Sequence, residues 1–69
     1  MEKEKLEKSF TYQAPKENQI DKYQALRQKA KELSLLINDL CPEGREKSLS
    51  ITKLEETIMW ANKSIAINE

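Results

Sequence analysis

The side chains best suited to chemistry in this 69-residue chain are one aromatic residue and a short basic run. Tyr12 offers a flat ring with a hydroxyl at its edge, and Arg27 presents a planar fork of donors that matches phosphate oxygens. Lys29 adds a point charge near Arg27, and Lys31 shares the face of Arg27 at i to i+4 spacing. Stacking on an aromatic ring and pairing with phosphate are the minimal requirements of a nucleotide site. From composition alone, Tyr12 packing on its own domain and a solvated basic face explain the same residues.

Catalytic machinery is sparse. The chain has no histidine and a single cysteine, so the commonest general base and metal ligand is missing. Cys41 cannot form an internal disulfide and has no histidine to activate its thiol, which is typical of a plain helix-end residue in a reducing compartment. Glu55 and Glu56 are adjacent and therefore point to different helix faces. We predict no catalytic residue, no metal site and no cofactor.

Two apolar seams must position the candidate residues. Both follow the three-then-four spacing of a and d positions in a heptad. They are Tyr23, Leu26, Ala30, Leu33, Ile37 and Leu40 in the first, and Ile51, Leu54, Ile58, Ala61 and Ile65 in the second. Since only Cys41-Pro42-Glu43-Gly44 separates them, the pattern predicts an all-α fold in which two helices pair as an antiparallel hairpin.

The helix ends are predicted from capping and helix-breaking residues. Asn18 can cap the first helix, which should then run to about Leu40. Pro42 cannot continue that helix, and Gly44 supplies a permissive backbone for the reversal. The second helix is expected from Arg45 to about Ile67.

The first residues are expected to form a short N-terminal arm or helix. Met1–Lys8 is charged around Leu6 and suits a frayed helical turn or a solvated tail, whereas Ser9–Pro15 is expected to be extended because a proline disfavours helix in the residue before it. We therefore divide the chain into an arm over residues 1–15 and a helical hairpin domain over residues 16–69.

Apolar residues off the two seams predict self-association. They are Ile20, Leu35, Leu36, Leu49, Met59, Trp60, Ala66 and Ile67. A hairpin uses one stripe per helix, so this surplus needs another partner, and the large ring of Trp60 is the costliest to leave in water. A 69-residue chain is also marginal as a lone two-helix hairpin.

The charge balance bears on partners. Twelve basic and twelve acidic residues cancel, which argues against bulk electrostatic binding to DNA or to a membrane surface. We see no secretory signal and no segment long enough to span a bilayer, and we expect a cytoplasmic protein.

Three stretches carry a resemblance to a known family. They are Phe10-Thr11-Tyr12, then Ile20-Asp21 leading to Arg27, and finally Arg45-Glu46-Lys47-Ser48-Leu49-Ser50-Ile51-Thr52-Lys53-Leu54-Glu55-Glu56 with Met59-Trp60-Ala61. Together they resemble the phage anti-CBASS cyclic-oligonucleotide sponge family, whose helical hairpin domain is shared with a phage anti-Thoeris sponge. The last stretch is the most specific, and the resemblance covers the chain from about Ser9 onward.

The resemblance implies a mechanism. Family members are all-helical protomers that assemble into hexamers and trap cyclic dinucleotides between protomers without cleaving them. The family tyrosine that stacks on a base falls on Tyr12, and the basic residue that holds phosphate falls on Arg27, where the family commonly has lysine. A second type of site, for cyclic trinucleotides at a threefold contact, implies a role for Arg45.

Three hypotheses follow. The leading one is a phage protein that sequesters cyclic dinucleotides and trinucleotides in the infected bacterial cell and so blocks activation of CBASS effectors, as a homo-oligomer that we expect to be a hexamer. The alternative is a structural or adaptor hairpin whose surplus apolar face docks another protein, which the heptads favour equally. Degradation of the signal comes third.

Overall fold

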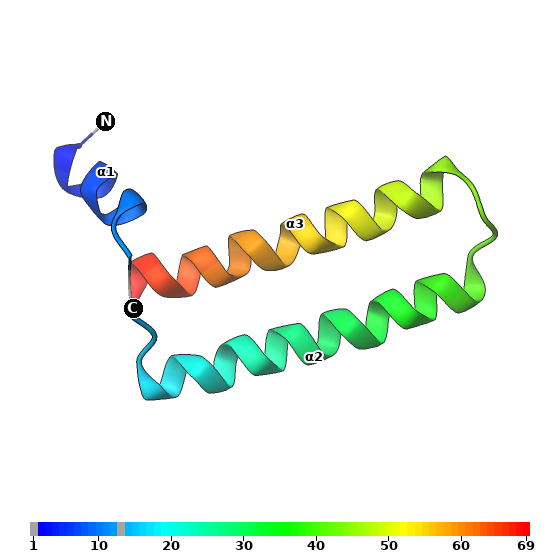
Figure 1. Cartoon of the computed structure of the whole chain (residues 1–69), viewed down its shortest axis with the longest axis horizontal. Coiled ribbons are helices and arrows are strands. Elements are labelled where there is room, and N and C mark those ends of the chain that lie inside the picture. Colours follow the sequence, from blue (N-terminus) through cyan, green and yellow to red (C-terminus); the bar gives the residue numbers. More distant parts are fainter. Residues whose placement is uncertain (1, 13) are drawn as a thin grey trace.

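The computed structural model describes residues 2–12 and 14–69, and in this part of the chain it contains three α-helices and no strand. The helices are α1 (Lys3–Phe10), α2 (Glu17–Leu40) and α3 (Arg45–Asn68). The two long helices lie side by side and run in opposite directions, and α1 lies beside the C-terminal end of α3, off the open end of the hairpin (Figure 1). The predicted all-α hairpin is therefore confirmed.

The start of α2 differs from the prediction. The helix begins at Glu17 with Lys16 as its N-cap residue, so Asn18 lies inside the first turn and does not cap it. The physical reason is the side chain of Gln19, whose Oε1 accepts the backbone N–H of Lys16 at 3.0 Å. The backbone N–H of Gln19 donates to the Lys16 carbonyl at 2.9 Å in return, and this pair of bonds fixes the helix start.

The loop between the long helices begins and ends as predicted, but the role predicted for Gly44 is wrong. The N–H of Cys41 donates to the Ile37 carbonyl at 2.9 Å and closes α2, and Pro42 prevents a further turn. Gly44 has φ 161° and ψ 174°, which is extended backbone that any residue adopts. The reversal is therefore made without a left-handed glycine.

The N-terminal arm is more helical than expected. Helix α1 continues through Phe10, so Ser9 and Phe10 are not extended, and the hydroxyl of Thr11 donates to the Glu7 carbonyl at 2.6 Å just beyond the last turn. Extended backbone begins at Thr11. Two residues of the predicted arm, Met1 and Gln13, lie outside the described residues.

The seam between α2 and α3 is only half-buried. The residues that face it are Tyr23, Leu26, Ala30, Ser34 and Ile37 on α2, and Ile51, Leu54, Ile58, Ala61 and Ile65 on α3. All five predicted positions of α3 are confirmed, whereas Leu33 and Leu40 of α2 are exposed. An α-helix with 3.6 residues per turn drifts by about 20° per heptad, so a strict heptad pattern turns away from the partner towards the end of a straight helix.

A protomer has no closed interior. No apolar residue among those described is buried, and the molecule measures 45 × 29 × 13 Å. Its accessible surface is 5943 Å², compared with about 4,500 Å² expected for a folded monomer of 8.1 kDa. The hairpin is therefore a single layer of helices that exposes more surface than a compact monomer of the same mass.

Polar side chains tie the two ends of the hairpin. At the open end, Gln19 is only 3% exposed and its Nε2 donates to the Ile65 carbonyl at 3.4 Å. At the loop end, the Lys47 ammonium donates to the Asn38 carbonyl at 3.0 Å. Both carbonyls belong to the last turn of a helix, where backbone acceptors have no partner within the helix. Each long helix therefore receives a C-terminal hydrogen bond from the other.

We predict that Gly44→Ser stabilises the protein. Gly44 is the N-cap of α3 and supplies no side-chain bond there, and a Cβ at this position would meet its nearest neighbour, the Glu46 carboxylate, at 3.4 Å, an ordinary contact. A serine hydroxyl can accept a free N–H of the first turn, which is worth roughly 0.3 kcal/mol relative to glycine and about 0.5–1 kcal/mol relative to alanine. Urea denaturation should show a higher midpoint for Gly44→Ser than for Gly44→Ala, which lacks the hydroxyl; equal midpoints would contradict the cap.

We predict that Gln19→Met destabilises the hairpin by about 1–2 kcal/mol, because it keeps the volume of Gln19 and leaves the Lys16 N–H and the Ile65 carbonyl without their bonds. The measurement is the free energy of unfolding at a fixed protein concentration. The exposed Gln24→Met on the same helix is the control and should change it by less than about 0.5 kcal/mol. An equal loss in the free energy of unfolding for Gln19→Met and Gln24→Met would show that the hydrogen bonds of the Gln19 amide do not stabilise the hairpin.

Candidate functional site

An open groove with a volume of about 510 Å³ lies between α2 and α3. We call it the interhelical groove. Its lining residues are Arg27, Ala30, Lys31 and Ser34 from α2, and Ile51, Leu54, Glu55 and Ile58 from α3. The groove is apolar at its floor and carries charged side chains at its margins.

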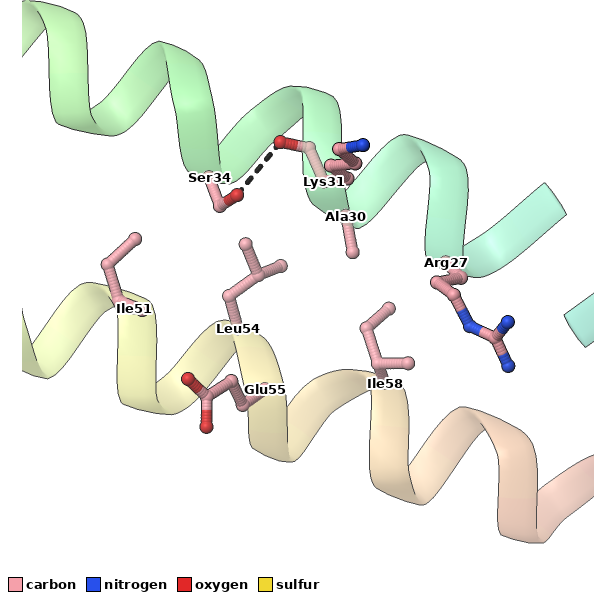
Figure 2. Close-up of a pocket in the computed structure, with 8 residues that line it drawn as sticks. All are labelled: Arg27, Ala30, Lys31, Ser34, Ile51, Leu54, Glu55 and Ile58. Carbon is pink, nitrogen blue, oxygen red and sulfur yellow. Dashed lines mark hydrogen bonds between the residues drawn. The ribbon is translucent and has the colours of Figure 1, made fainter. Parts of the chain in front are cut away.

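The groove exists because small residues of α2 face large ones of α3. Ala30 and Ser34 point towards α3 but are too short to fill the space above Leu54 and Ile58, which point back at them (Figure 2). The Ser34 hydroxyl is turned to its own helix and donates to the Lys31 carbonyl at 2.8 Å. The short side chains of Ala30 and Ser34 therefore leave an unfilled strip along the seam.

Arg27 is the only one of the four predicted site residues that lines the groove. Its guanidinium extends towards α3 at one end of the groove, while the carboxylate of Glu55 points away from α2 (Figure 2). No carboxylate among the described residues lies within ion-pair distance of Arg27. The five donors of this guanidinium are consequently available to an external anion.

The unpaired state of Arg27 is part of a pattern. The chain has two arginines, Arg27 and Arg45, and neither forms an ion pair with the described carboxylates. All four ion pairs of the described residues use lysine instead, namely Lys22, Lys29, Lys47 and Lys53. The residue type best shaped for phosphate is thus left without a carboxylate partner among the described residues, whereas four of the ten lysines have one.

Tyr12 lies on the linker between α1 and α2 and is 84% exposed. The linker runs past the open end of the hairpin (Figure 1), whereas Arg27 lies ten residues into α2, about 15 Å further along its axis at 1.5 Å per residue. The ring and the guanidinium are not brought together in one protomer. A large aromatic ring left in water has room for a stacking partner on its face.

The other two predicted site residues lie elsewhere. Lys29 points away from the interhelical groove and pairs with Glu32 at 3.4 Å on the outer face of α2. Arg45 is the first residue of α3 and is exposed at the loop end. Arg27 lies thirteen residues before the end of α2, about 20 Å along the helix, so Arg27 and Arg45 cannot hold one small ligand within the same protomer.

Two further properties of the described residues bear on chemistry. No group of three or more His, Cys, Asp or Glu side chains comes together there in a way that could hold a metal ion. None of the helices in residues 2–12 and 14–69 is both long and apolar enough to cross a bilayer.

Sequence reasoning missed three residues that shape the surface. Ser34 lines the groove in place of Leu33, and Gln19 and Lys47 tie the hairpin ends. A signal was present for the last two, because each is the third residue of its helix and an antiparallel partner brings a C-terminal carbonyl to that place. Ser34 gave no such signal, since its small polar side chain is compatible with either face.

Comparison with known proteins identifies the family. No curated protein and no solved structure matches the chain. The family model described as the Acb2/Tad1 hairpin domain matches residues 2–66, which include nearly all of the arm, all of α2, α3 up to Ala66 and all four predicted site residues. This chain therefore belongs to the Acb2/Tad1 hairpin-domain family, the family of anti-CBASS and anti-Thoeris sponges.

Proposed function

We propose that this protein is a phage anti-defence sponge that binds cyclic dinucleotides made by bacterial immune synthases and withholds them, intact, from CBASS effectors in the cytoplasm of the infected cell. The observation that carries the proposal is the unpaired guanidinium of Arg27 at the end of an open apolar groove, in a chain that belongs to this family. Apolar surface suits a base, and a free guanidinium suits a phosphate.

The site lies between protomers. Tyr12 and Arg27 are separated within one chain, and a protomer has neither a closed pocket nor a buried apolar core to enclose a ligand. Two copies related by a twofold axis supply each residue twice, which matches the two bases and two phosphates of a cyclic dinucleotide. In this arrangement the arm over residues 1–15 of one copy delivers Tyr12 to the hairpin domain, residues 16–69, of the other.

Because Lys29 points away from the groove that Arg27 lines, its role is secondary and directed at a ligand held by a neighbouring copy. Its ammonium forms an exposed pair with Glu32, and such surface pairs are worth little, so the charge is free to exchange this carboxylate for a phosphate of the ligand. Arg45 serves the second type of site, which takes cyclic trinucleotides where three loop ends meet.

Self-association is supported by surface that a monomer does not need. The accessible area exceeds the value typical of an 8.1 kDa monomer by about 1,400 Å². Trp60 is 64% exposed beside Met59 on α3, and Leu35 and Leu36 are exposed on α2. Apolar faces on both long helices favour a closed assembly with more than one kind of contact, and we propose a hexamer.

We predict that Tyr12→Ala and Arg27→Ala each weaken the binding of a cyclic dinucleotide by about ten- to a hundredfold in calorimetry, because stacking on a base and a charged hydrogen bond are each worth about 1–3 kcal/mol. Tyr12→Phe keeps the ring and should bind nearly as well. The matched control is the exposed Lys53→Met. Heating the complex should release the ligand unchanged in mass.

Each alternative function predicts a different result in that experiment. Heat exchange with none of the cyclic dinucleotides would overturn the sponge and favour the adaptor hairpin, whose exposed apolar faces would serve a protein partner. Recovery of a linear product would favour degradation of the signal. Binding that survives both alanine substitutions would overturn the assignment of Tyr12 and Arg27.

We predict an oligomer without any ligand. Light scattering at micromolar concentration should give about six times the 8.1 kDa protomer mass. The emission of Trp60, the one tryptophan of the chain, should be that of an indole shielded from water. A monomer mass at this concentration would contradict the shared-site mechanism, whatever the binding data show.

A further inference from the structure

Lys47 is an unusual lysine. Its side chain is only 10% exposed, although it is charged and belongs to a protomer without a buried apolar core. Its ammonium lies 2.6 Å from Oε1 of Glu43 and donates to the Asn38 carbonyl at 3.0 Å. Lysine is rarely this buried unless it is paired, so the two bonds account for its position.

The bonds of Lys47 connect three consecutive parts of the chain. Asn38 belongs to the last turn of α2, Glu43 to the loop, and Lys47 to the first turn of α3. The last turn of α2 has no basic residue of its own to complement its free carbonyls and the negative end of its dipole, and Lys47 supplies that charge from the neighbouring helix. Lys47 therefore fixes the direction in which α3 leaves the loop.

Arg45 is next to this arrangement in the sequence. It is the first residue of α3 and lies between Glu43 and Lys47 in the sequence. The five residues from Glu43 to Lys47 therefore carry all three side chains. The Glu43 carboxylate is 89% exposed, and without Lys47 it would be a free negative charge two residues from Arg45. Such a charge would pair with the guanidinium or repel a phosphate beside it.

We infer that Lys47 is a positioning residue for the Arg45 site: it holds the first turn of α3 in place and neutralises Glu43, so that Arg45 stays free for a phosphate of a cyclic trinucleotide. The inference rests on the proposed function at Arg45. It adds a residue that does not touch the ligand and acts through the geometry and charge of its surroundings.

The test is calorimetry with one cyclic trinucleotide and one cyclic dinucleotide on the assembled full-length protein. Lys47→Met keeps the length of the side chain and should weaken trinucleotide binding by about tenfold, corresponding to the loss of one charged interaction, while dinucleotide binding changes by less than about twofold. The control Lys53→Met removes an exposed lysine from the same helix and should leave both affinities unchanged.

A second variant separates the charge from the fold. Adding Glu43→Gln to Lys47→Met should restore part of the trinucleotide affinity, because the unpaired carboxylate is gone; a purely structural role would give no restoration. Glu43→Gln alone affects an exposed side chain and leaves the bond from Lys47 to Asn38, so it should bind trinucleotide within about twofold of the unchanged protein. This single variant tests the inference even where Lys47→Met does not fold.

The outcomes distinguish the inference from the function it rests on. Equal losses for both ligands in Lys47→Met, or a loss in Glu43→Gln as large as in Arg45→Ala, would overturn the inference. Trinucleotide binding that survives Lys47→Met but not Arg45→Ala would overturn it while the Arg45 site stands. If the unchanged protein takes up no trinucleotide, or Arg45→Ala binds it fully, the second site fails and the inference fails with it.

Discussion

The antiparallel contact between α2 and α3 organises the whole protomer. It places the N-terminal turn of each long helix beside the C-terminal turn of the other, and the third residue of each helix donates a hydrogen bond across that gap. Gln19 reaches the Ile65 carbonyl and Lys47 the Asn38 carbonyl. Carbonyl groups that a single helix leaves unpaired thus become the points at which the hairpin is held. The half-buried seam between these two ends then only has to keep the helices in register.

A single layer of helices has consequences for binding. With a thickness of 13 Å and no buried apolar residue among those described, the protomer offers grooves and faces but no enclosed cavity. The interhelical groove is open because Ala30 and Ser34 are short, and its volume of about 510 Å³ is within the range of small-molecule sites. In the proposed assembly, a site shared between copies would supply the missing walls and at the same time cover exposed apolar surface. Assembly and ligand binding would then draw on the same faces.

Lysines and arginines differ in their ion pairing among the described residues. Lysines make the ion pairs of the described residues, including Lys22 with Glu69 at 2.7 Å across the open end and Lys47 with Glu43 at the loop end. The two arginines remain without carboxylates, one at the groove and one at the loop end. A planar, permanently charged fork is well matched to phosphate.

The sequence is sufficient to predict the two long helices, the end of one at Leu40 and the start of the other at Arg45, the antiparallel hairpin and the family, because these follow from local periodicity, from Pro42 and from contiguous motifs. The three-dimensional structure was needed to show that Ser34 rather than Leu33 faces the partner, that α2 begins before Asn18, that Gly44 is extended, and that Gln19 and Lys47 connect the helix ends. Which residue faces the seam depends on the rotation of each helix about its axis, and the hydrogen bonds of Gln19 and Lys47 depend on which helix ends meet. Neither is encoded in the spacing of residues along one helix.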